Sequence, residues 1–335
     1  MPANGSGDSF AMTELITHFP GQELPVSEVG NRLRQMWDND GEESPSHFRA
    51  SQMNIVLHFG FQITPEEALA AFNSLLLFVQ RYPGRIIVLC PNEAQRDGSM
   101  SAKLFSQCYI GPSQREMCCC EALMLSFEPD DCGYLSNQVS VWLESDLPTY
   151  HWFMGVPEIR IRKYFDNLLK GVRRMVYDSS REESDIADLD WPRPEGVRDL
   201  AQARLLPIRQ SLGQFFSGFP MELIQDGLQA ISLNYAAGKR GEAKRLAEWI
   251  KSCLSLDLVV ETLPIEPREP ASDQENPLIL DMVWTYQNDY YFKWEFYQEG
   301  DRARFDYKLG SESKAFMTQL KPLAPEQALA EALFF

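Results

Sequence analysis

Residues 53–90 read MNIVLHFGFQITPEEALAAFNSLLLFVQRYPGRIIVLC, and this stretch decides the fold. Its first seven residues are mostly apolar and indicate a strand. Thr64 can cap the helix that follows, Pro65 suits the first helical position, and Glu67 completes a capping box. That helix should end near Arg81, and the last six residues read as a second strand, buried on both faces. A strand, a helix and a strand in this order predict a βαβ unit with a parallel sheet.

The rest of the sequence extends this unit into one domain and adds another. Residues 1–50 are expected to contain a leader and a helix, and residues 51–182 an α/β domain. A charged, proline-containing crossing then leads to an α+β domain at residues 196–335. Two domains are also what the length of 335 residues predicts, because single cores stop growing beyond roughly 250–300 residues.

The other expected elements follow from hydrophobic periodicity and turn residues. Helices are expected at 26–37, 134–144, 164–169, 199–216, 241–254 and 324–333. Strands are expected at 102–110, 116–127, 149–154, 173–177, 228–235 and 257–263, and an antiparallel meander at 278–321. The predicted fold class is α/β, and α+β overall. It combines an N-terminal mixed or parallel sheet flanked by helices with a C-terminal α+β domain that ends in the meander.

The net charge of −17 narrows the set of partners. Such a field repels nucleic-acid phosphates and anionic lipid, so neither is expected to bind. No apolar run approaches the roughly 20 residues that a membrane helix needs, and we expect a cytoplasmic protein with no membrane partner. The acidity either serves solubility alone or complements a basic patch on a protein partner.

The seven cysteines are interpreted as reduced thiols, because an odd count in a long chain argues against a disulfide framework. Cys118 and Cys120 share one face of an expected strand. They are buried apolar thiols, a redox-sensitive pair or zinc ligands, although adjacent cysteines lack the usual zinc spacing. Cys132 lies in a polar turn and is the thiol most expected to be exposed. The redox candidates are therefore Cys118, Cys120 and Cys132, and no metal is predicted.

The sequence lacks the motifs that nucleotide enzymes and hydrolases need. Dinucleotide binding requires a glycine-rich turn after a strand, but the expected strand at 53–59 is followed by the single Gly60. There is no Walker A motif and no Gly-x-Ser-x-Gly elbow. We therefore expect no enzymatic activity and no cofactor.

Two histidines keep an alternative open. His58 and His151 both lie in expected strands, where they are either satisfied sheet histidines or general bases. Asp146 and Asp178 are placed near the carboxyl ends of strands, where ligands of α/β proteins collect. An enzyme hidden in this sequence would have to use that geometry.

Basic residues cluster in one region despite the acidic background. The cluster comprises Arg160, Arg162, Lys163 and Arg173. These residues either form a solvated helix face or contact a sugar phosphate or an acidic partner.

Four phrases, in this order, resemble the OpcA family. The first is Met53-Asn54-Ile55-Val56, and the second runs from Tyr82-Pro83-Gly84-Arg85 to Leu89. The third is Asp146-Leu147-Pro148 with Trp152 and Gly155, and the fourth is Val176-Tyr177-Asp178-Ser179. Two later helices, at 199–216 and 242–254, extend the resemblance to Leu254. The chain departs from the family at Tyr82, Gly84, Phe153 and Ile208, which marks a divergent member.

The resemblance implies a non-catalytic partner of glucose-6-phosphate dehydrogenase, acting in the pentose phosphate pathway as an assembly factor and allosteric activator. It implies family-defining or partner-binding residues at Arg85, Asp146, Leu147, Pro148, Trp152, Asp178 and Ser179. Their role is either contact with the partner or the architecture of a strand corner. The alternative function is a sugar-phosphate-binding sensor or enzyme that uses the α/β domain and its basic cluster.

Overall fold

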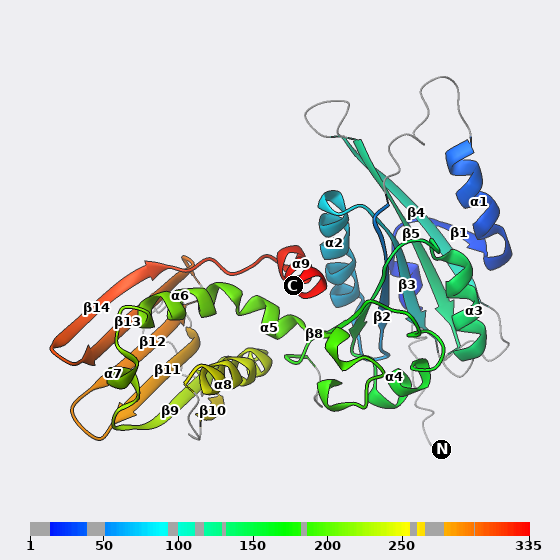
Figure 1. Cartoon of the computed structure of the whole chain (residues 1–335). Coiled ribbons are helices and arrows are strands. Elements are labelled where there is room, and N and C mark those ends of the chain that lie inside the picture. Colours follow the sequence, from blue (N-terminus) through cyan, green and yellow to red (C-terminus); the bar gives the residue numbers. More distant parts are fainter. Residues whose placement is uncertain are drawn as a thin grey trace, which may run out of the picture. The chain divides into compact units, whose positions relative to one another are not determined.

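A computed structural model describes residues 14–38, 51–92, 100–110, 117–128, 132–181, 186–254, 260–264, 278–297 and 299–335. The chain divides into two compact units, Met1–Met175 and Val176–Phe335 (Figure 1). The sequence pattern predicts that the first domain extends to residue 182. In the structure the boundary falls after Met175, so Asp178 and Ser179 belong to the second unit.

The first unit contains a mixed sheet and its helices. Its elements are η1 (Leu15–His18), β1 (Gln22–Pro25), α1 (Val26–Asp38), β2 (Met53–Phe59), α2 (Pro65–Arg81), β3 (Gly84–Pro91), β4 (Ser101–Ile110), β5 (Met117–Phe127), α3 (Cys132–Trp142), β6 (Thr149–Met154), α4 (Glu158–Tyr164) and β7 (Arg174–Tyr177), which spans the boundary. Among these strands the order in the sheet is β1-β4-β5-β3-β2-β6-β7. β5, β3, β2 and β6 run parallel, while β1 and β4 pair antiparallel at one side. The predicted α/β class is confirmed.

The βαβ unit at residues 53–90 forms as its local signals predict. The backbone N–H of Glu67 donates to Thr64 Oγ1 at 3.3 Å, and the backbone N–H of Thr64 donates to the Glu67 carboxylate at 3.0 Å. This reciprocal cap satisfies two donors at the start of α2. Every residue of β2 is buried, as expected for a central strand that is covered on both faces.

The helices cover both faces of this sheet. The crossover β2-α2-β3 runs in one direction along the sheet, whereas β5-α3-β6 returns in the other. Because such crossovers are right-handed, opposite directions place α2 and α3 on opposite faces, as Figure 1 shows. The connections that follow β2 and β6 also lead in opposite directions. These two adjacent strands therefore define the topological switch point, where doubly wound folds bind ligands.

The second unit combines short helices with a six-stranded sheet. Its elements are η3 (Ile186–Asp188), η4 (Pro194–Gly196), β8 (Val197–Asp199), α5 (Leu200–Arg204), α6 (Leu206–Phe216), α7 (Met221–Gln225), β9 (Leu228–Tyr235), α8 (Arg240–Leu254), β10 (Val260–Pro264), β11 (Leu278–Tyr286), β12 (Tyr291–Tyr297), β13 (Arg302–Leu309), β14 (Glu312–Gln319) and α9 (Pro325–Phe334). The strand order is β10-β9-β11-β12-β13-β14, and β11 to β14 form the predicted antiparallel meander.

The core of the second unit lies between the helices and one face of this sheet. Burial alternates along β12 and β13, so every second side chain points into the core. The ring of Phe216 stacks on Trp284 with centroids 4.7 Å apart, and Phe215 contacts Phe292 at 5.1 Å. The meander aromatics on this face thus serve the core.

Two of the predicted helices are wrong in extent. The single helix expected at 199–216 is interrupted at Leu205, because Pro207 occupies the first turn of α6 and a proline cannot continue a helix from upstream. The helix expected at 164–169 is instead α4, which follows Pro157 as its N-cap and ends at Tyr164. Residues 165–171 form turns.

Candidate functional site

Arg85 is the centre of a buried ionic cluster in the first unit. Its Nε donates to the Glu121 carboxylate at 3.1 Å, and its Nη1 donates to the carbonyl oxygen of Trp142 at 2.7 Å. Its Nη2 lies 2.6 Å from a carboxylate oxygen of Glu144. Arg85 is only 7% exposed, so its contacts join β3, β5 and the end of α3. These contacts favour an architectural role for Arg85 over contact with a partner.

Asn54 holds the turn that contains the third family phrase. Its side-chain Nδ2 donates to the carbonyl oxygen of Glu144 at 2.9 Å, and its Oδ1 accepts from the Glu144 backbone N–H at 3.0 Å. The Asn54 backbone N–H donates to the carbonyl oxygen of Pro148 at 2.9 Å. A buried amide on β2 thus fixes the chain between α3 and β6. The first family phrase, which begins at Met53, is therefore hydrogen-bonded to the turn that contains Asp146-Leu147-Pro148. We call this turn the corner.

The members of that corner differ in accessibility. Trp152 is buried in β6 at 8% exposure, and Leu147 and Pro148 are half-buried. The side chain of Asp146 is exposed, and its described contact is with the Ser145 hydroxyl at 3.5 Å. Asp146 is therefore the member of the third phrase that is available to another molecule.

Two large hydrophobic side chains on α3 are exposed. Tyr134 is 46% exposed and Val141 is 74% exposed. The two residues are seven apart, so they share one face of the helix. We call Tyr134, Val141 and Asp146 the α3 surface.

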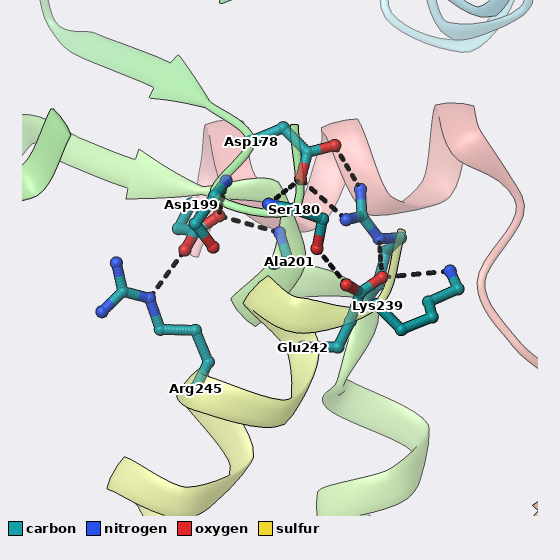
Figure 2. Close-up of polar contacts among 9 residues, drawn as sticks. Asp178, Ser180, Asp199, Ala201, Lys239, Glu242 and Arg245 are labelled. Carbon is teal, nitrogen blue, oxygen red and sulfur yellow. Dashed lines mark hydrogen bonds and ion pairs between the residues drawn. The ribbon is translucent and has the colours of Figure 1, made fainter. Parts of the chain in front are cut away.

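The second unit contains a larger ionic network around Arg204 (Figure 2). The guanidinium binds Asp178 through two hydrogen bonds of 2.8 Å, and its Nε donates to Glu242 at 2.8 Å. Lys239 lies 3.1 Å from the same Glu242 carboxylate, which also accepts from the Ser180 hydroxyl. Burial by itself lowers the pKa of Arg204, but the contacts with Asp178 and Glu242 outweigh it and raise the pKa above its ordinary value. The two buried carboxylates thus keep Arg204 charged.

Asp199 organises the other half of the network. Its carboxylate accepts from the backbone N–H groups of Ala201 at 2.9 Å and Ser179 at 3.1 Å, which caps α5. It also pairs with Arg245 on α8 at 2.7 Å, and Arg245 donates to the Tyr177 hydroxyl at 2.6 Å. Asp178 and Ser179 belong to the fourth family phrase. The contacts around them hold the start of the second unit against α5 and α8.

Sequence reasoning singled out Asp178 and Ser179 but missed Arg204, Glu242 and Arg245. Arg204 follows Asp178 by 26 residues, and Glu242 follows its partner Ser180 by 62. Neither separation leaves a periodic signal in the sequence. One hint was available at Gly241, because a Cβ there would lie 2.5 Å from the Ser180 backbone nitrogen. A glycine in the first turn of an amphipathic helix indicates close approach of another segment.

His58 and His151 form a buried pair on the neighbouring strands β2 and β6. His58 Nε2 lies 2.8 Å from His151 Nδ1, and the two residues are 2% and 1% exposed. Burial lowers the pKa of His151 to about 3. Burial, and then the proximity of His151, lowers the pKa of His58 well below its ordinary value. Both imidazoles are neutral at pH 7, and their burial favours the satisfied sheet histidine over the general base.

The switch point beyond β2 and β6 is closed by backbone. Gly60 follows β2 and Gly155 follows β6, and the Gly60 N–H donates to the carbonyl oxygen of Met154 at 2.9 Å. A Cβ on Gly60 would lie 1.6 Å from the carbonyl oxygen of Gly155, which itself has a φ of +65°. A Cβ on Gly155 would lie 2.7 Å from Ile63 Cδ1. The place where a doubly wound fold admits a pyrophosphate is here filled by main chain.

Replacement of Gly60 by alanine should destabilise the first unit by about 3 kcal/mol, because the added methyl group overlaps the Gly155 backbone. Urea unfolding of the purified chain measures the change. The matched control is Gly133→Ala in α3, where nothing lies within 4 Å of the added Cβ. That variant should be neutral or slightly more stable. Equal stability of Gly60→Ala and the native chain would show that the strand ends are not closed as described.

Three residues of the predicted basic cluster lie on α4, and Arg173 lies beyond its end. Arg162 pairs with Glu158 one turn earlier at 2.7 Å, and the Arg160 guanidinium lies 5.7 Å from the ring centroid of Phe61. Lys163 and Arg173 are exposed. This arrangement favours the solvated helix face over the phosphate site.

Among the described cysteines, Cys90 and Cys120 are buried and Cys253 is exposed. Cys120 lies on β5, and burial raises the pKa of the Cys90 thiol. Cys108 is disulfide-bonded, which corrects the expectation that all thiols are reduced. The side chains of Cys118 and Cys132 lie outside the described residues, so the redox proposal for them stays a prediction.

Within the part of the chain that the structure describes, no three His, Cys, Asp or Glu side chains gather as metal ligands. None of the helices described there is long and apolar enough to span a membrane.

Residues 78–191, which contain the Arg85 cluster and the α3 surface, match a family model described as the glucose-6-phosphate dehydrogenase subunit N-terminal domain of the OpcA assembly type. The chain is also 28% identical, over 178 residues, to the "Putative OxPP cycle protein OpcA" of Synechocystis sp.. That alignment covers 51% of this chain and 37% of the relative. Together the two matches support membership of the OpcA family.

Two solved structures show a weaker, overall likeness. Glucose-6-phosphate 1-dehydrogenase from Mycobacterium avium has a TM-score of 0.38 and 10% identity, with 85% of this chain and 87% of that chain covered. An NAD-binding oxidoreductase from Klebsiella pneumoniae has a TM-score of 0.40 and 10% identity, with 85% and 83% covered. Likenesses at these values say nothing about activity.

Proposed function

We propose that this protein is a non-catalytic assembly factor and allosteric activator that binds glucose-6-phosphate dehydrogenase in the cytoplasm. The match over residues 78–191 carries the proposal, since that family model is described by its relation to the dehydrogenase. Activation would arise because the protein binds the active oligomeric state of the enzyme more tightly than the inactive one.

Three features of the first unit support a role without catalysis. The switch point beside Gly60 and Gly155 is filled by backbone. The histidine pair is buried and neutral, so neither imidazole reaches a substrate. The buried guanidinium of Arg85 is committed to Glu121 and to the end of α3. The polar groups that an enzyme would use are thus occupied in holding the fold.

The α3 surface is our proposed contact with the dehydrogenase. It lies inside the matched segment, and it includes an exposed apolar side chain, Val141, and an exposed carboxylate, Asp146. An apolar centre with a polar rim is the usual anatomy of a protein interface. The net charge of −17 favours a basic patch on the partner.

Replacement of Val141 by glutamate should weaken binding to the host's glucose-6-phosphate dehydrogenase at least about tenfold, because a charge would be buried in the centre of the contact. Asp146→Lys should weaken binding less and reduce its dependence on salt. Surface plasmon resonance with the immobilised dehydrogenase measures both effects.

The control for these variants is Ile159→Glu on α4, because Ile159 is as exposed as Val141, at 71%, but lies off the α3 surface. That variant should bind like the native chain. Equal affinities for Val141→Glu and the native chain would remove the α3 surface from the proposal. Absence of any binding by the native chain would reject the dehydrogenase as the partner.

A further inference from the structure

β14 forms one edge of the sheet of the second unit, as Figure 1 shows. An edge strand presents unpaired backbone N–H and C=O groups, and proteins usually protect it by a short length, a bulge, a proline or a cover. The opposite edge, β10, has five residues and ends at Pro264. β14 has eight residues, contains no proline and pairs with β13 without a register shift. Seven of its residues are exposed in the described part of the chain, so this edge lacks the usual protection.

The hairpin before β14 determines which of its backbone groups point outward. Leu309 pairs with Glu312 across a two-residue turn, in which Gly310 has a φ of +60°. A hydrogen-bonded pair closes such a turn, and non-hydrogen-bonded and hydrogen-bonded pairs alternate from there along the hairpin. Every second residue, counted from Glu312, therefore directs its backbone groups to β13. The N–H and C=O groups of the other four residues point away from the sheet: Ser313, Ala315, Met317 and Gln319.

The side chains of β14 make this edge apolar and locally neutral. Phe316 is 42% exposed, although its ring stacks on Phe305 with centroids 5.1 Å apart. Met317 is 51% exposed and points to the opposite face of the sheet. The two charged residues of the strand, Glu312 and Lys314, form an ion pair of 3.2 Å. In a chain with a net charge of −17, two copies can approach one another at this strand without opposed like charges.

We propose that β14 pairs antiparallel with β14 of a second copy of this chain, about a two-fold axis at Phe316. Of the possible registers, only this one pairs all the outward-pointing residues with one another. Ser313 lies opposite Gln319, and Ala315 lies opposite Met317, in both directions across the axis. The proposal does not rest on the dehydrogenase contact, because the α3 surface belongs to the first unit.

The side chains are compatible with this register. Phe316 faces its counterpart in the second copy as a non-hydrogen-bonded pair, in which side chains come closest, so the aromatic stack continues across the axis. Lys314 lies opposite Thr318, and the large Met317 lies opposite the small Ala315. No like charges are therefore directly opposed, which would destabilise the pairing. The strand is complementary to itself in its backbone and in its side chains.

Sedimentation velocity of the native chain, from about 1 µM to about 200 µM, tests the pairing. One strand edge is smaller than a standard interface, so we expect a weak dimer whose average mass rises from one chain towards two. Added salt should tighten it, because the net charge of −17 repels the second copy most at low ionic strength. A native chain that stays monomeric over this range, in low and high salt, overturns the proposal.

Two variants and a control locate the contact. Ala315→Pro removes an outward N–H, which proline can do at an edge without loss of a bond to the neighbouring strand, and it should stay monomeric. Phe316→Lys opposes like charges across the axis and should weaken dimerisation at least about tenfold. The control is Met221→Lys on α7, because Met221 is 48% exposed but lies off the edge, and it should dimerise like the native chain. Thermal unfolding checks that each variant is folded. A dimer that persists in folded Ala315→Pro, or is lost equally in Met221→Lys, overturns the proposal.

Disulfide cross-linking with copper phenanthroline tests the position of the axis. Phe316→Cys should form a covalent dimer above the level of the native chain, because a non-hydrogen-bonded pair has Cα atoms about 4.5 Å apart, within disulfide reach. Thr318→Cys should not, because its counterpart lies four positions along the strand, about 14 Å away. Equal cross-linking of the two variants overturns the axis at Phe316. If the native chain is monomeric but Ala315→Pro weakens binding to the dehydrogenase, β14 pairs with that enzyme and pairing between copies is overturned.

Discussion

Replacement of Arg204 by alanine is expected to lower the free energy of unfolding of the second unit by about 3–5 kcal/mol. The side chain neutralises two carboxylates, Asp178 and Glu242, that are 9% and 3% exposed. Without Arg204, Asp178 loses both of its 2.8 Å ionic hydrogen bonds, and Glu242 keeps only Lys239 as a described cation. A buried charge left without its partner is among the most destabilising changes in a protein.

Hydrogen exchange of α8 and β9 peptides in increasing urea measures this loss within the second unit. Arg240→Ala, at an exposed position on α8, should leave the protection unchanged. A rescue variant separates charge from packing. Arg204→Met combined with Asp178→Asn and Glu242→Gln removes the uncompensated charges and should recover part of the loss. If Arg204→Ala is as stable as the native chain, the network does not hold the second unit together.

Acidification from pH 8 to pH 5 is expected to lower the free energy of unfolding of the first unit by about 2 kcal/mol or more. The folded pKa of His151 is about 3 and that of His58 is well below its ordinary value, both because of burial. Below pH 6.5 the unfolded imidazoles therefore bind protons that the folded ones do not. The contribution is present above the unfolded pKa of about 6.5 and is lost progressively as the pH falls towards the folded values.

Hydrogen exchange of β2 and β6 peptides in increasing urea, at several pH values between 5 and 8, measures the free energy of unfolding. His151→Gln should halve the slope of stability against pH, and His58→Gln with His151→Gln should nearly abolish it. His18→Gln, at an exposed position in η1, should leave the slope unchanged. A flat profile in the native chain would mean that the two imidazoles are not held neutral in the fold.

The fold of the first unit follows closely from local sequence signals. Thr64, Pro65 and Glu67 fix the start of α2, and the apolar runs on either side can only be central strands of a parallel sheet. β1 gave no such signal, because its four residues, Gln22–Pro25, are mostly exposed and lack a periodic pattern. It exists because it pairs antiparallel with β4. Tertiary pairing of this kind overrides weak propensity.

The candidate sites were only partly predictable. The family phrases identified Arg85 and Asp178 as important, but their partners depend on the tertiary structure. Glu144 reaches Arg85 from the end of α3, and Glu242 reaches Arg204 from α8. The sequence also did not predict that backbone closes the strand ends at Gly60 and Gly155. An isolated glycine after a strand is equally consistent with an open ligand crevice. Sequence reasoning found the absence of a phosphate loop, and the structure supplies a physical reason for it.

The central claim, that the chain assembles and activates glucose-6-phosphate dehydrogenase without catalysis of its own, is tested most directly by titration of the purified chain into the host's dehydrogenase. Enzyme activity and the mass from light scattering are recorded on the same samples. The account predicts that activity per dehydrogenase subunit rises to a plateau while the two proteins elute together as a larger complex. Unchanged activity together with separate elution at micromolar concentrations of both proteins would contradict it.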